Sequence, residues 1–234
     1  SWSQQQKLTA SDAATTDNFS NGVAIDGEYA IIASPGNDDD GDNSGSAYIF
    51  FADFDAVAPT GSGTSADPYL IANLANLSWL SQNSSEWDKY YKQTANIDAS
   101  ATQYWDDADG DSDGDKYNDA NDGNSTGSDE GFSSIGNSTT KFTGTYDGQN
   151  YTISNLYINR SSTWNIGLFG YTNGATIQNL GVGVSITGEY YVGGMVGYNT
   201  NSTVSNSYIT GSISGYYKVG GFVGSNVNST VSSS

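Results

Sequence analysis

The residues best suited to chemistry lie in one acidic stretch, residues 106–123, with the sequence DDADGDSDGDKYNDANDG. This stretch places eight carboxylates in eighteen residues. Carboxylate oxygens are the ligands that calcium prefers, and crowded carboxylates repel one another unless a cation lies between them. We therefore predict a calcium site, with a metal-free, solvated acidic loop as the alternative. The predicted ligands are Asp107, Asp109, Asp111, Asp113, Asp115 and Asp119.

The spacing of three of these aspartates resembles a known type of loop. Asp109, Asp111 and Asp113 are followed by Gly114, which is similar to the D-x-D-x-D-G calcium loops of dockerins and thrombospondin repeats. The twelfth position is Ala120, where an EF-hand has glutamate, so an EF-hand is excluded. A second candidate calcium site is NDDDGDNSG at 37–45, for which a bare hairpin loop is the alternative. Its predicted ligands are Asp38, Asp40 and Asp42.

Composition excludes several classes of function. The formal net charge is −19 with seven basic residues, so a nucleic-acid backbone or an anionic membrane would repel the chain. Cysteine and histidine are absent, which removes disulfides, the usual zinc sites and histidine acid–base catalysis. No apolar run approaches the length of a membrane span. From Ser161 onward the sole carboxylate side chain is Glu189 and the sole basic one is Lys218, so we predict that the chain is not an enzyme.

The elements that position these residues are predicted by a repeat of 27 residues near the end of the chain. Equivalent positions recur at this step without insertions, for example Leu168, Met195 and Phe222, or Ile177, Val204 and Val231. Short alternating runs punctuated by glycine and asparagine predict three strands per repeat, stacked as rungs of a parallel β-helix. The register predicts a buried column formed by Ile177, Val204 and Val231, and a hydrogen-bonded column containing Asn179 and Asn206. A β-sandwich with coincidental self-similarity is the alternative.

The residues before the repeat predict how the solenoid begins. TISNL at 152–156 matches TIQNL at 176–180 at a spacing of 24 residues, which predicts an earlier rung whose turn is shorter or differently bent. Leucines at 70, 74, 77 and 80 predict an amphipathic helix over about residues 67–82, which would cover the apolar end of the first rung. Residues 58–66 are predicted to be a linker, and residues 106–130 an acidic insertion in the solenoid.

Two resemblances follow from these segments. The units GLFGY…TIQNL and VGGMVGY…VSNSYITGSISG resemble GLUG-motif repeats of bacterial surface proteins, with a lead-in over residues 61–160. That resemblance implies a right-handed parallel β-helix over 67–234 in an extracellular, adhesin-like or polymeric protein at the cell surface, and it supplies no catalytic residues. DNFSNGVAIDGEYAIIASPGNDDDGDNSGSAYIF, within residues 1–57, resembles one FG-GAP repeat, the blade unit of β-propellers. A single repeat cannot close a propeller, so this β module is expected to pack on the solenoid or on another molecule.

Two further features bear on partners. Tyr190, Tyr191, Tyr216 and Tyr217 fall at one corner of successive units; we interpret them as rings that stack on one another, with sugar binding as the alternative. The sequence stops at Ser234, midway through a unit, which predicts an uncovered rung. Either the sequence is a piece of a longer repeat protein or another copy covers that rung.

Taken together, these features favour a non-enzymatic extracellular protein that assembles head to tail into a surface filament, with calcium stabilising its acidic loops. A glycan-binding adhesin module of a larger surface protein is the alternative. A polysaccharide-active enzyme is the third hypothesis, and it would need a cluster of carboxylates on one face of the solenoid. Nine asparagines precede x-Ser/Thr, so glycosylation is compatible with the sequence.

Overall fold

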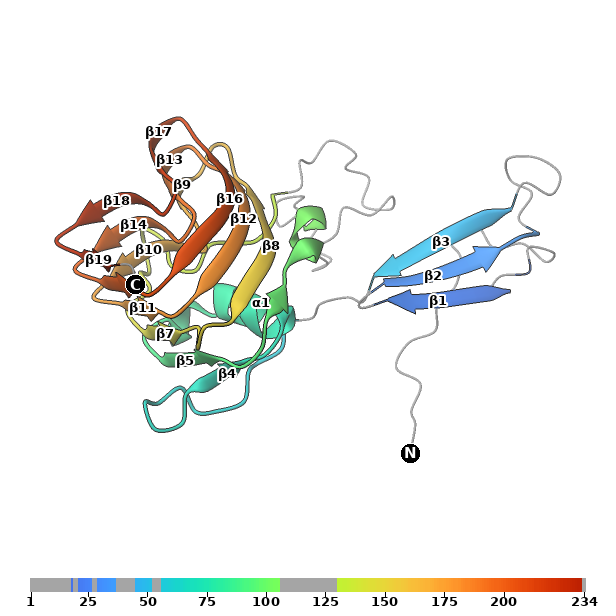
Figure 1. The fold of residues 1–234 in the computed structure, drawn as a ribbon, viewed down its shortest axis with the longest axis horizontal. Coiled ribbons are helices and arrows are strands. Elements are labelled where there is room, and N and C mark those ends of the chain that lie inside the picture. Colours follow the sequence, from blue (N-terminus) through green and yellow to red (C-terminus); the bar gives the residue numbers. More distant parts are fainter. Residues whose placement is uncertain are drawn as a thin grey trace. The chain divides into compact units, whose positions relative to one another are not determined.

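The computed structural model describes residues 18, 21–26, 29–36, 45–51, 56–105 and 130–232 of the 234-residue chain (Figure 1). It divides into two compact units, Ser1–Asp53 and Phe54–Ser234. In the first unit, three antiparallel strands pair in the order β1-β2-β3: β1 (Gly22–Asp26), β2 (Tyr29–Ser34) and β3 (Ser46–Phe51). These strands lie within residues 1–57, which contain the segment that resembles an FG-GAP repeat.

The second unit is a parallel β-solenoid, as the 27-residue repeat predicts. Within residues 56–105 and 130–232, its strands stack in four sheets, of orders β19-β15-β11-β7-β5-β4, β16-β12-β8-β6, β17-β13-β9 and β10-β14-β18. The strands are β4 (Tyr69–Ile71), β5 (Tyr90–Gln93), β6 (Ile97–Asp98), β7 (Thr145–Asp147), β8 (Thr152–Asn159), β9 (Trp164–Ile166), β10 (Phe169–Asn173), β11 (Thr176–Gln178), β12 (Gly181–Thr187), β13 (Tyr190–Gly193), β14 (Val196–Thr200), β15 (Thr203–Ser205), β16 (Tyr208–Ser214), β17 (Tyr217–Gly220), β18 (Val223–Val227) and β19 (Thr230–Ser232).

The predicted columns are present in the stack. Ile177 pairs with Val204 and Val204 with Val231 in parallel register. Ile177 and Val204 are fully buried, whereas Val231, on the last described rung, is 44% exposed. In the second column, the Nδ2 of Asn206 donates to the Oδ1 of Asn179 over 3.2 Å. A third column, which is also polar, starts inside the solenoid, where the Oγ1 of Thr172 donates to the Oδ1 of Asn199 over 2.6 Å, and continues to the last described rung, where the Nδ2 of Asn199 donates to the Oδ1 of the exposed Asn226 over 2.8 Å. Side-chain ladders along the axis therefore reinforce the backbone pairing.

The predicted 24-residue spacing of the earlier rung is wrong. TISNL lies in β8, which pairs with β12, so Ile153 stacks on Val182. TIQNL lies mostly in β11, which pairs with β7, so Ile177 stacks on Tyr146. The two similar segments therefore occupy different sheets. Their likeness reflects a shared strand–turn pattern, and not an equivalent place in the stack.

The helix is shorter than predicted. α1 (Leu74–Gln82) begins at Leu74, because Asn73 caps it by accepting a hydrogen bond at its Oδ1 from the backbone N–H of Asn76, over 3.0 Å. Residues 69–71, predicted as the first helical turn, instead form β4, whose backbone groups pair with β5. The buried face of α1 joins the core through Leu74, Leu77 and Leu80. Two single-turn 3-10 helices complete the unit, η1 (Ser84–Glu86) and η2 (Ser100–Tyr104).

Residues 58–66, predicted to be a linker, fall within the second unit, and they and Val57 before them contact α1 and β4. The backbone N–H of Val57 donates to the carbonyl of Ala75 over 3.2 Å, and the Nδ2 of Asn76 donates to the carbonyl of Val57 over 3.0 Å. Thr60 forms an antiparallel bridge with Leu70. Backbone contacts of this kind fix residues 57–60 against α1 and β4.

Candidate functional site

The predicted calcium ligands lie outside the described residues. This holds for Asp107, Asp109, Asp111, Asp113, Asp115 and Asp119, and for Asp38, Asp40 and Asp42. In the part of the chain that the structure describes, no three acidic side chains come close enough together to hold a metal ion. Calcium binding by either acidic stretch therefore stays a prediction.

The structure does describe the two points between which the longer acidic stretch is inserted. The backbone N–H of Gly131 donates to the carbonyl of Trp105 over 2.9 Å. Trp105 is buried, and its ring lies 6.2 Å from that of Phe132. Residues 106–129 therefore begin and end at adjacent points on a packed base.

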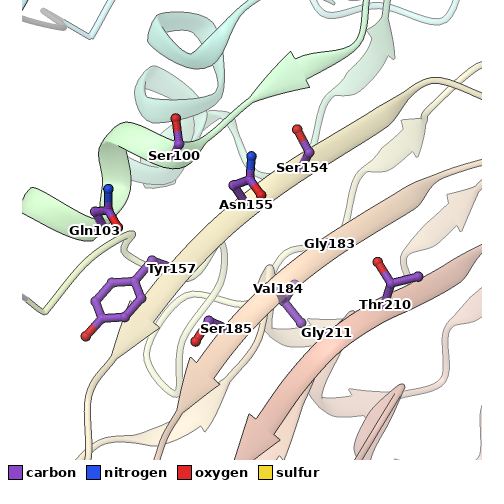
Figure 2. A pocket seen from close by; sticks show the side chains of 10 residues that line it. All are labelled: Ser100, Gln103, Ser154, Asn155, Tyr157, Gly183, Val184, Ser185, Thr210 and Gly211. Carbon is purple, nitrogen blue, oxygen red and sulfur yellow. The ribbon is translucent and has the colours of Figure 1, made fainter.

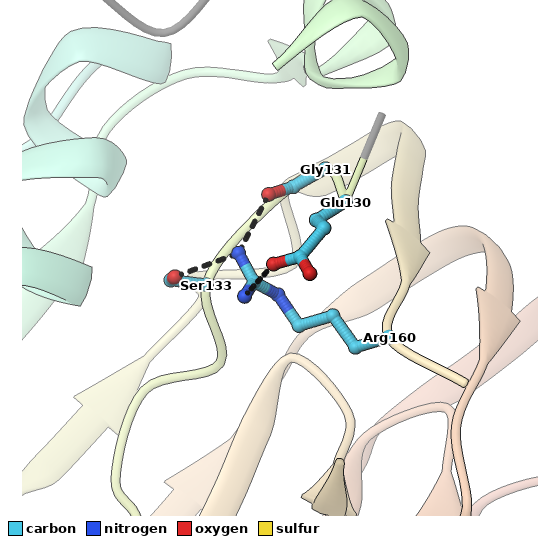
Figure 3. Close-up of polar contacts among 4 residues, drawn as sticks. All are labelled: Glu130, Gly131, Ser133 and Arg160. Carbon is cyan, nitrogen blue, oxygen red and sulfur yellow. Dashed lines mark hydrogen bonds and ion pairs between the residues drawn. The ribbon is translucent and has the colours of Figure 1, made fainter. Parts of the chain in front are cut away.

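Arg160 fixes the segment that follows this insertion (Figure 3). Its Nη1 donates to the Oε2 of Glu130 over 2.7 Å, and its Nη2 donates to the carbonyl of Gly131 and to the Oγ of Ser133 over 3.2 and 3.0 Å. Both charged side chains are partly buried, so this pair is screened less than a surface pair. Sequence reasoning missed this role. The available signal was that Arg160 is the single arginine of the chain, placed directly after a predicted strand.

The predicted tyrosine corner exists and is larger than predicted. The ring of Tyr190 lies 5.8 Å from that of Tyr216 and 5.6 Å from that of Tyr217, so the rings contact one another as interpreted. Trp164, which the sequence did not assign to the corner, lies 4.8 Å from Tyr190. It pairs with Tyr190 in parallel register at a 26-residue step, so a search at 27 misses it. Tyr216 remains 79% exposed.

The two charged side chains of the last rungs also lie at this corner. The Oε2 of Glu189 accepts a hydrogen bond from the Nε1 of Trp164 over 3.0 Å. The Nζ of Lys218 lies 4.8 Å from the centre of the Tyr191 ring, within cation–π range. Each charged side chain thus contacts an aromatic ring. After residue 160 the other three sides of these rungs have no charged side chain.

A groove of about 620 Å³ lies on the sheet that contains β8, β12 and β16, beside η2 (Figure 2). In Figure 2, Gln103 and Tyr157 lie on one side of the groove and Thr210 on the other. All of its lining residues are uncharged. They are Ser100, Gln103, Ser154, Asn155, Tyr157, Gly183, Val184, Ser185, Thr210 and Gly211. Sequence reasoning did not find this groove.

The groove forms because the stack is irregular here. Between Val182 and Val184 the register of β12 against β8 shifts, so that β8 contributes one extra residue and bulges. Asn155, at φ 59°, lies in this bulge. On the neighbouring rungs Gly183 and Gly211 contribute no side chain. Gly211 is required by its backbone, since it has φ +112° and a Cβ there would lie 1.9 Å from the carbonyl oxygen of Val184.

Two carboxylates near the solenoid surface are stabilised in their ionised form. Burial acts to raise the pKa of Asp98, but hydrogen bonds from the Asn155 side chain and from Ser100 outweigh it and hold that pKa below its usual value. The Oδ1 of Asp98 accepts from the Nδ2 of Asn155 over 3.0 Å, which orients this amide at the groove. The pKa of Asp147 is lowered in the same way: burial opposes the shift, and hydrogen bonds from Asn179, Gln149 and Gln178 outweigh it.

Comparison with known proteins supports both predicted resemblances. Residues 2–50 match the FG-GAP repeat and residues 188–214 match the GLUG motif. Halomucin of Haloquadratum walsbyi (strain DSM 16790 / HBSQ001) is 36% identical over 142 residues, which cover 57% of this chain and 1% of halomucin. The chain therefore corresponds to a very small part of that protein's length. No solved structure matches the chain. Over the described residues, no helix has the length and apolar character needed to cross a bilayer.

Proposed function

We propose that this chain is a structural β-solenoid module of a cell-surface protein. The observation that carries the proposal is the parallel register of the strands. Paired residues on successive rungs are 27 residues apart in the sequence, as are Thr176, Thr203 and Thr230. In such a stack each rung is stabilised by its neighbours, so the fold extends by repetition and suits a long, stiff protein. The GLUG motif and the similarity to halomucin support the surface assignment.

The proposed module is not catalytic. Glycoside hydrolysis needs a pair of carboxylates facing one sugar, and the last three rungs carry a single carboxylate, Glu189, which accepts a hydrogen bond from Trp164. The test is incubation of the purified protein with a panel of polysaccharides. We expect no release of reducing ends, and release from any substrate would contradict a purely structural role.

The finer proposal is that copies of this chain contact each other head to tail. On the last described rung, Val219, Val227 and Val231 are 43, 37 and 44% exposed, and the equivalent positions on the preceding rung are less exposed. Its strands β16, β17, β18 and β19 each pair on one side within the described residues. A second copy that adds a strand to each sheet would pair these free edges and bury the valines. Contacts of this head-to-tail kind generate filaments when they do not close.

Electron microscopy and light scattering test this contact. We expect particles whose length grows with protein concentration, and shorter particles for Val231→Lys, which places a charge on the uncovered column. Tyr151→Lys is the matched control, because Tyr151 is also exposed, by 37%, but lies on an earlier rung of the solenoid. A concentration-independent monomer for the wild-type protein would refute assembly between copies while leaving the solenoid module intact.

We also propose that the acidic stretches bind calcium, on the strength of their aspartate spacing. A ligand that binds only the folded state raises the unfolding temperature in proportion to the logarithm of its concentration. We expect calcium to raise the unfolding temperature and a chelator to reverse the rise. In the triple variant Asp109→Asn, Asp111→Asn and Asp113→Asn this response should shrink. An equal response to magnesium would indicate general screening of charge rather than a calcium site.

Glycan binding is a second candidate function. The observation that favours it is the uncharged groove of Figure 2, which presents hydroxyl and amide groups together with the ring of Tyr157. Such a surface differs from the acidic stretches at 37–45 and 106–123, where the carboxylates are dense.

A further inference from the structure

We infer that the groove between η2 and strands β8, β12 and β16 is a binding site for a neutral oligosaccharide. The inference rests on the second candidate function and names its site and ligand class. The volume of about 620 Å³ falls within the range of small-molecule sites. The groove is built on paired strands, so its shape exists before a ligand binds, which lowers the cost of ordering the site on binding.

The side chains around the groove match the chemistry of a sugar. A pyranose ring has hydroxyl groups at its edge and C–H groups on its faces, so it needs hydrogen-bonding partners together with an apolar surface. Gln103 and Asn155 supply amides, and Thr210 supplies a hydroxyl. The ring of Tyr157 supplies apolar surface, whereas Val184 is 6% exposed and belongs to the hydrophobic core behind the groove. Asp98 holds the amide of Asn155 in place from behind.

Charge decides which sugars fit. None of the ten lining residues is charged, so the groove has no cation to pair with a carboxylate or sulfate group. The chain as a whole carries a net charge of −19, which repels anionic polymers at a distance. A neutral oligosaccharide has no charge that needs a cation in the groove, and the net charge of the chain does not repel it. The ligand class is therefore a neutral glycan, and uronate-rich or sulfated glycans are excluded.

Gly183 offers a way to block the groove without disturbing the fold. A Cβ at this position would meet its nearest neighbour, the Oγ1 of Thr210, at 3.4 Å, which is an ordinary contact. The Gly183→Gln variant therefore fills the groove with a side chain while the backbone stays as it is. Gly221→Gln is the matched control: it makes the same change at an exposed glycine whose Cβ would meet nothing within 4 Å.

The experiment is native electrophoresis through gels that contain a dissolved polysaccharide, since the strongly negative protein migrates readily. The probes are hydroxyethylcellulose, galactomannan and soluble starch as neutral polymers, and alginate as an anionic one. We expect at least one neutral polymer to retard the wild-type protein and Gly221→Gln, and alginate to retard neither. Gly183→Gln should weaken the binding at least about tenfold. Tyr157→Ala should weaken it about fivefold or more, and Tyr157→Phe less, because the apolar ring remains.

Several results would overturn the assignment. Wild-type protein that passes every neutral gel without retardation has no such site. Equal retardation of Gly183→Gln and Gly221→Gln would place any binding elsewhere, and loss of binding in Trp164→Ala alone would place it at the aromatic corner. Circular dichroism of each variant shows whether the fold is intact. If Gly183→Gln misfolds, Tyr157→Ala decides. A negative result here leaves the structural module standing, because that proposal is judged by particle length.

Discussion

Truncating the same residue on two successive rungs gives the most direct test of the stack. Val204 and Val231 pair in register in adjacent strands β15 and β19. Val204 is fully buried beneath the last described rung, and Val231 on that rung is 44% exposed. The variants Val204→Ala and Val231→Ala therefore make an identical chemical change at equivalent positions that differ in burial.

The magnitudes follow from that difference. Val→Ala removes two methyl groups, which costs about 1.6 kcal/mol of transfer free energy in a fully buried site. The cavity left inside the solenoid adds to this, for a total of about 2–3 kcal/mol for Val204→Ala. At Val231 the side chain is half in water and leaves no enclosed cavity, so the cost is less than about 1 kcal/mol. For a protein of this size, each kcal/mol lowers the unfolding temperature by about 2–4 °C.

The assay is thermal unfolding followed by circular dichroism in dilute protein. We expect Val204→Ala to lower the unfolding temperature by about 4–12 °C and Val231→Ala by less than about 4 °C. Repeating the measurement in concentrated protein extends the test. If copies cover the last rung, Val231 becomes buried, and the penalty of Val231→Ala should approach that of Val204→Ala. Equal penalties in dilute protein would refute the difference in burial between Val204 and Val231.

Four further outcomes are expected. In calcium-free buffer, replacing residues 106–129 by a four-residue Gly-Ser linker should keep the solenoid folded and raise its free energy of unfolding by about 1–2 kcal/mol, because Trp105 and Gly131 already meet and a shorter loop costs less entropy to close. Loss of cooperative unfolding in urea would contradict this. Arg160→Ala should lower the free energy of unfolding in the same assay by about 1–3 kcal/mol, with partial recovery in Arg160→Lys. Asp147 has a lowered pKa, so its contribution to the free energy of unfolding is present above its unfolded-state pKa, near 4, and is lost as the pH falls through its folded pKa. Asp147→Asn should therefore lower the midpoint of urea unfolding at pH 7, and it should reduce the fall of that midpoint between pH 5 and pH 3. Sodium chloride should raise the unfolding temperature, since it screens the repulsion within a chain of net charge −19, and no change with salt would mean that this repulsion is already neutralised.

The sequence predicts the later rungs well because they repeat without insertions. Thr176, Thr203 and Thr230 keep one step, so the paired strands can be assigned from spacing alone. The earlier rungs could not be aligned in this way. Their turns differ in length, so that Thr145 pairs with Thr176 at a step of 31 residues and Ile153 with Val182 at a step of 29. The similarity between TISNL and TIQNL therefore predicts that the two segments pair in one sheet, although they lie in different sheets.

The start of the helix was missed for a related reason. Leu70 has the helical spacing of Leu74 and Leu77, but strand β4 gains backbone pairing with β5 that a first helical turn would forgo. The cap at Asn73 then fixes where the helix begins. Periodicity reports which side chains face the core, and it does not report which backbone partner is available. Tertiary pairing therefore overrides the local pattern.

The groove shows what single-chain periodicity leaves out. Asn155, Gly183 and Gly211 are separated by 28 residues at each step, and none of them is exceptional in a sequence with 29 glycines and many asparagines. Their effect arises only across strands, where an extra residue in β8 lies beside two positions without side chains. Arg160 is comparable, because its partners at 130–133 become neighbours through the return of the chain after the insertion. Sites formed by residues on neighbouring rungs can be predicted only after the register between the strands is known.

Charged residues are unevenly distributed along the chain, so the proposed calcium sites and the proposed sugar site lie in different segments. The acidic stretches at 37–45 and 106–123 hold the dense carboxylates, while residues 161–234 contain one acidic and one basic side chain. A cation and a neutral sugar therefore address different residues. If the two proposals hold, chelating calcium should lower the unfolding temperature without changing polysaccharide retardation, and Gly183→Gln should weaken retardation without changing the response of the unfolding temperature to calcium, because sites that share no partner contribute independently. Loss of retardation on chelation alone would contradict this independence.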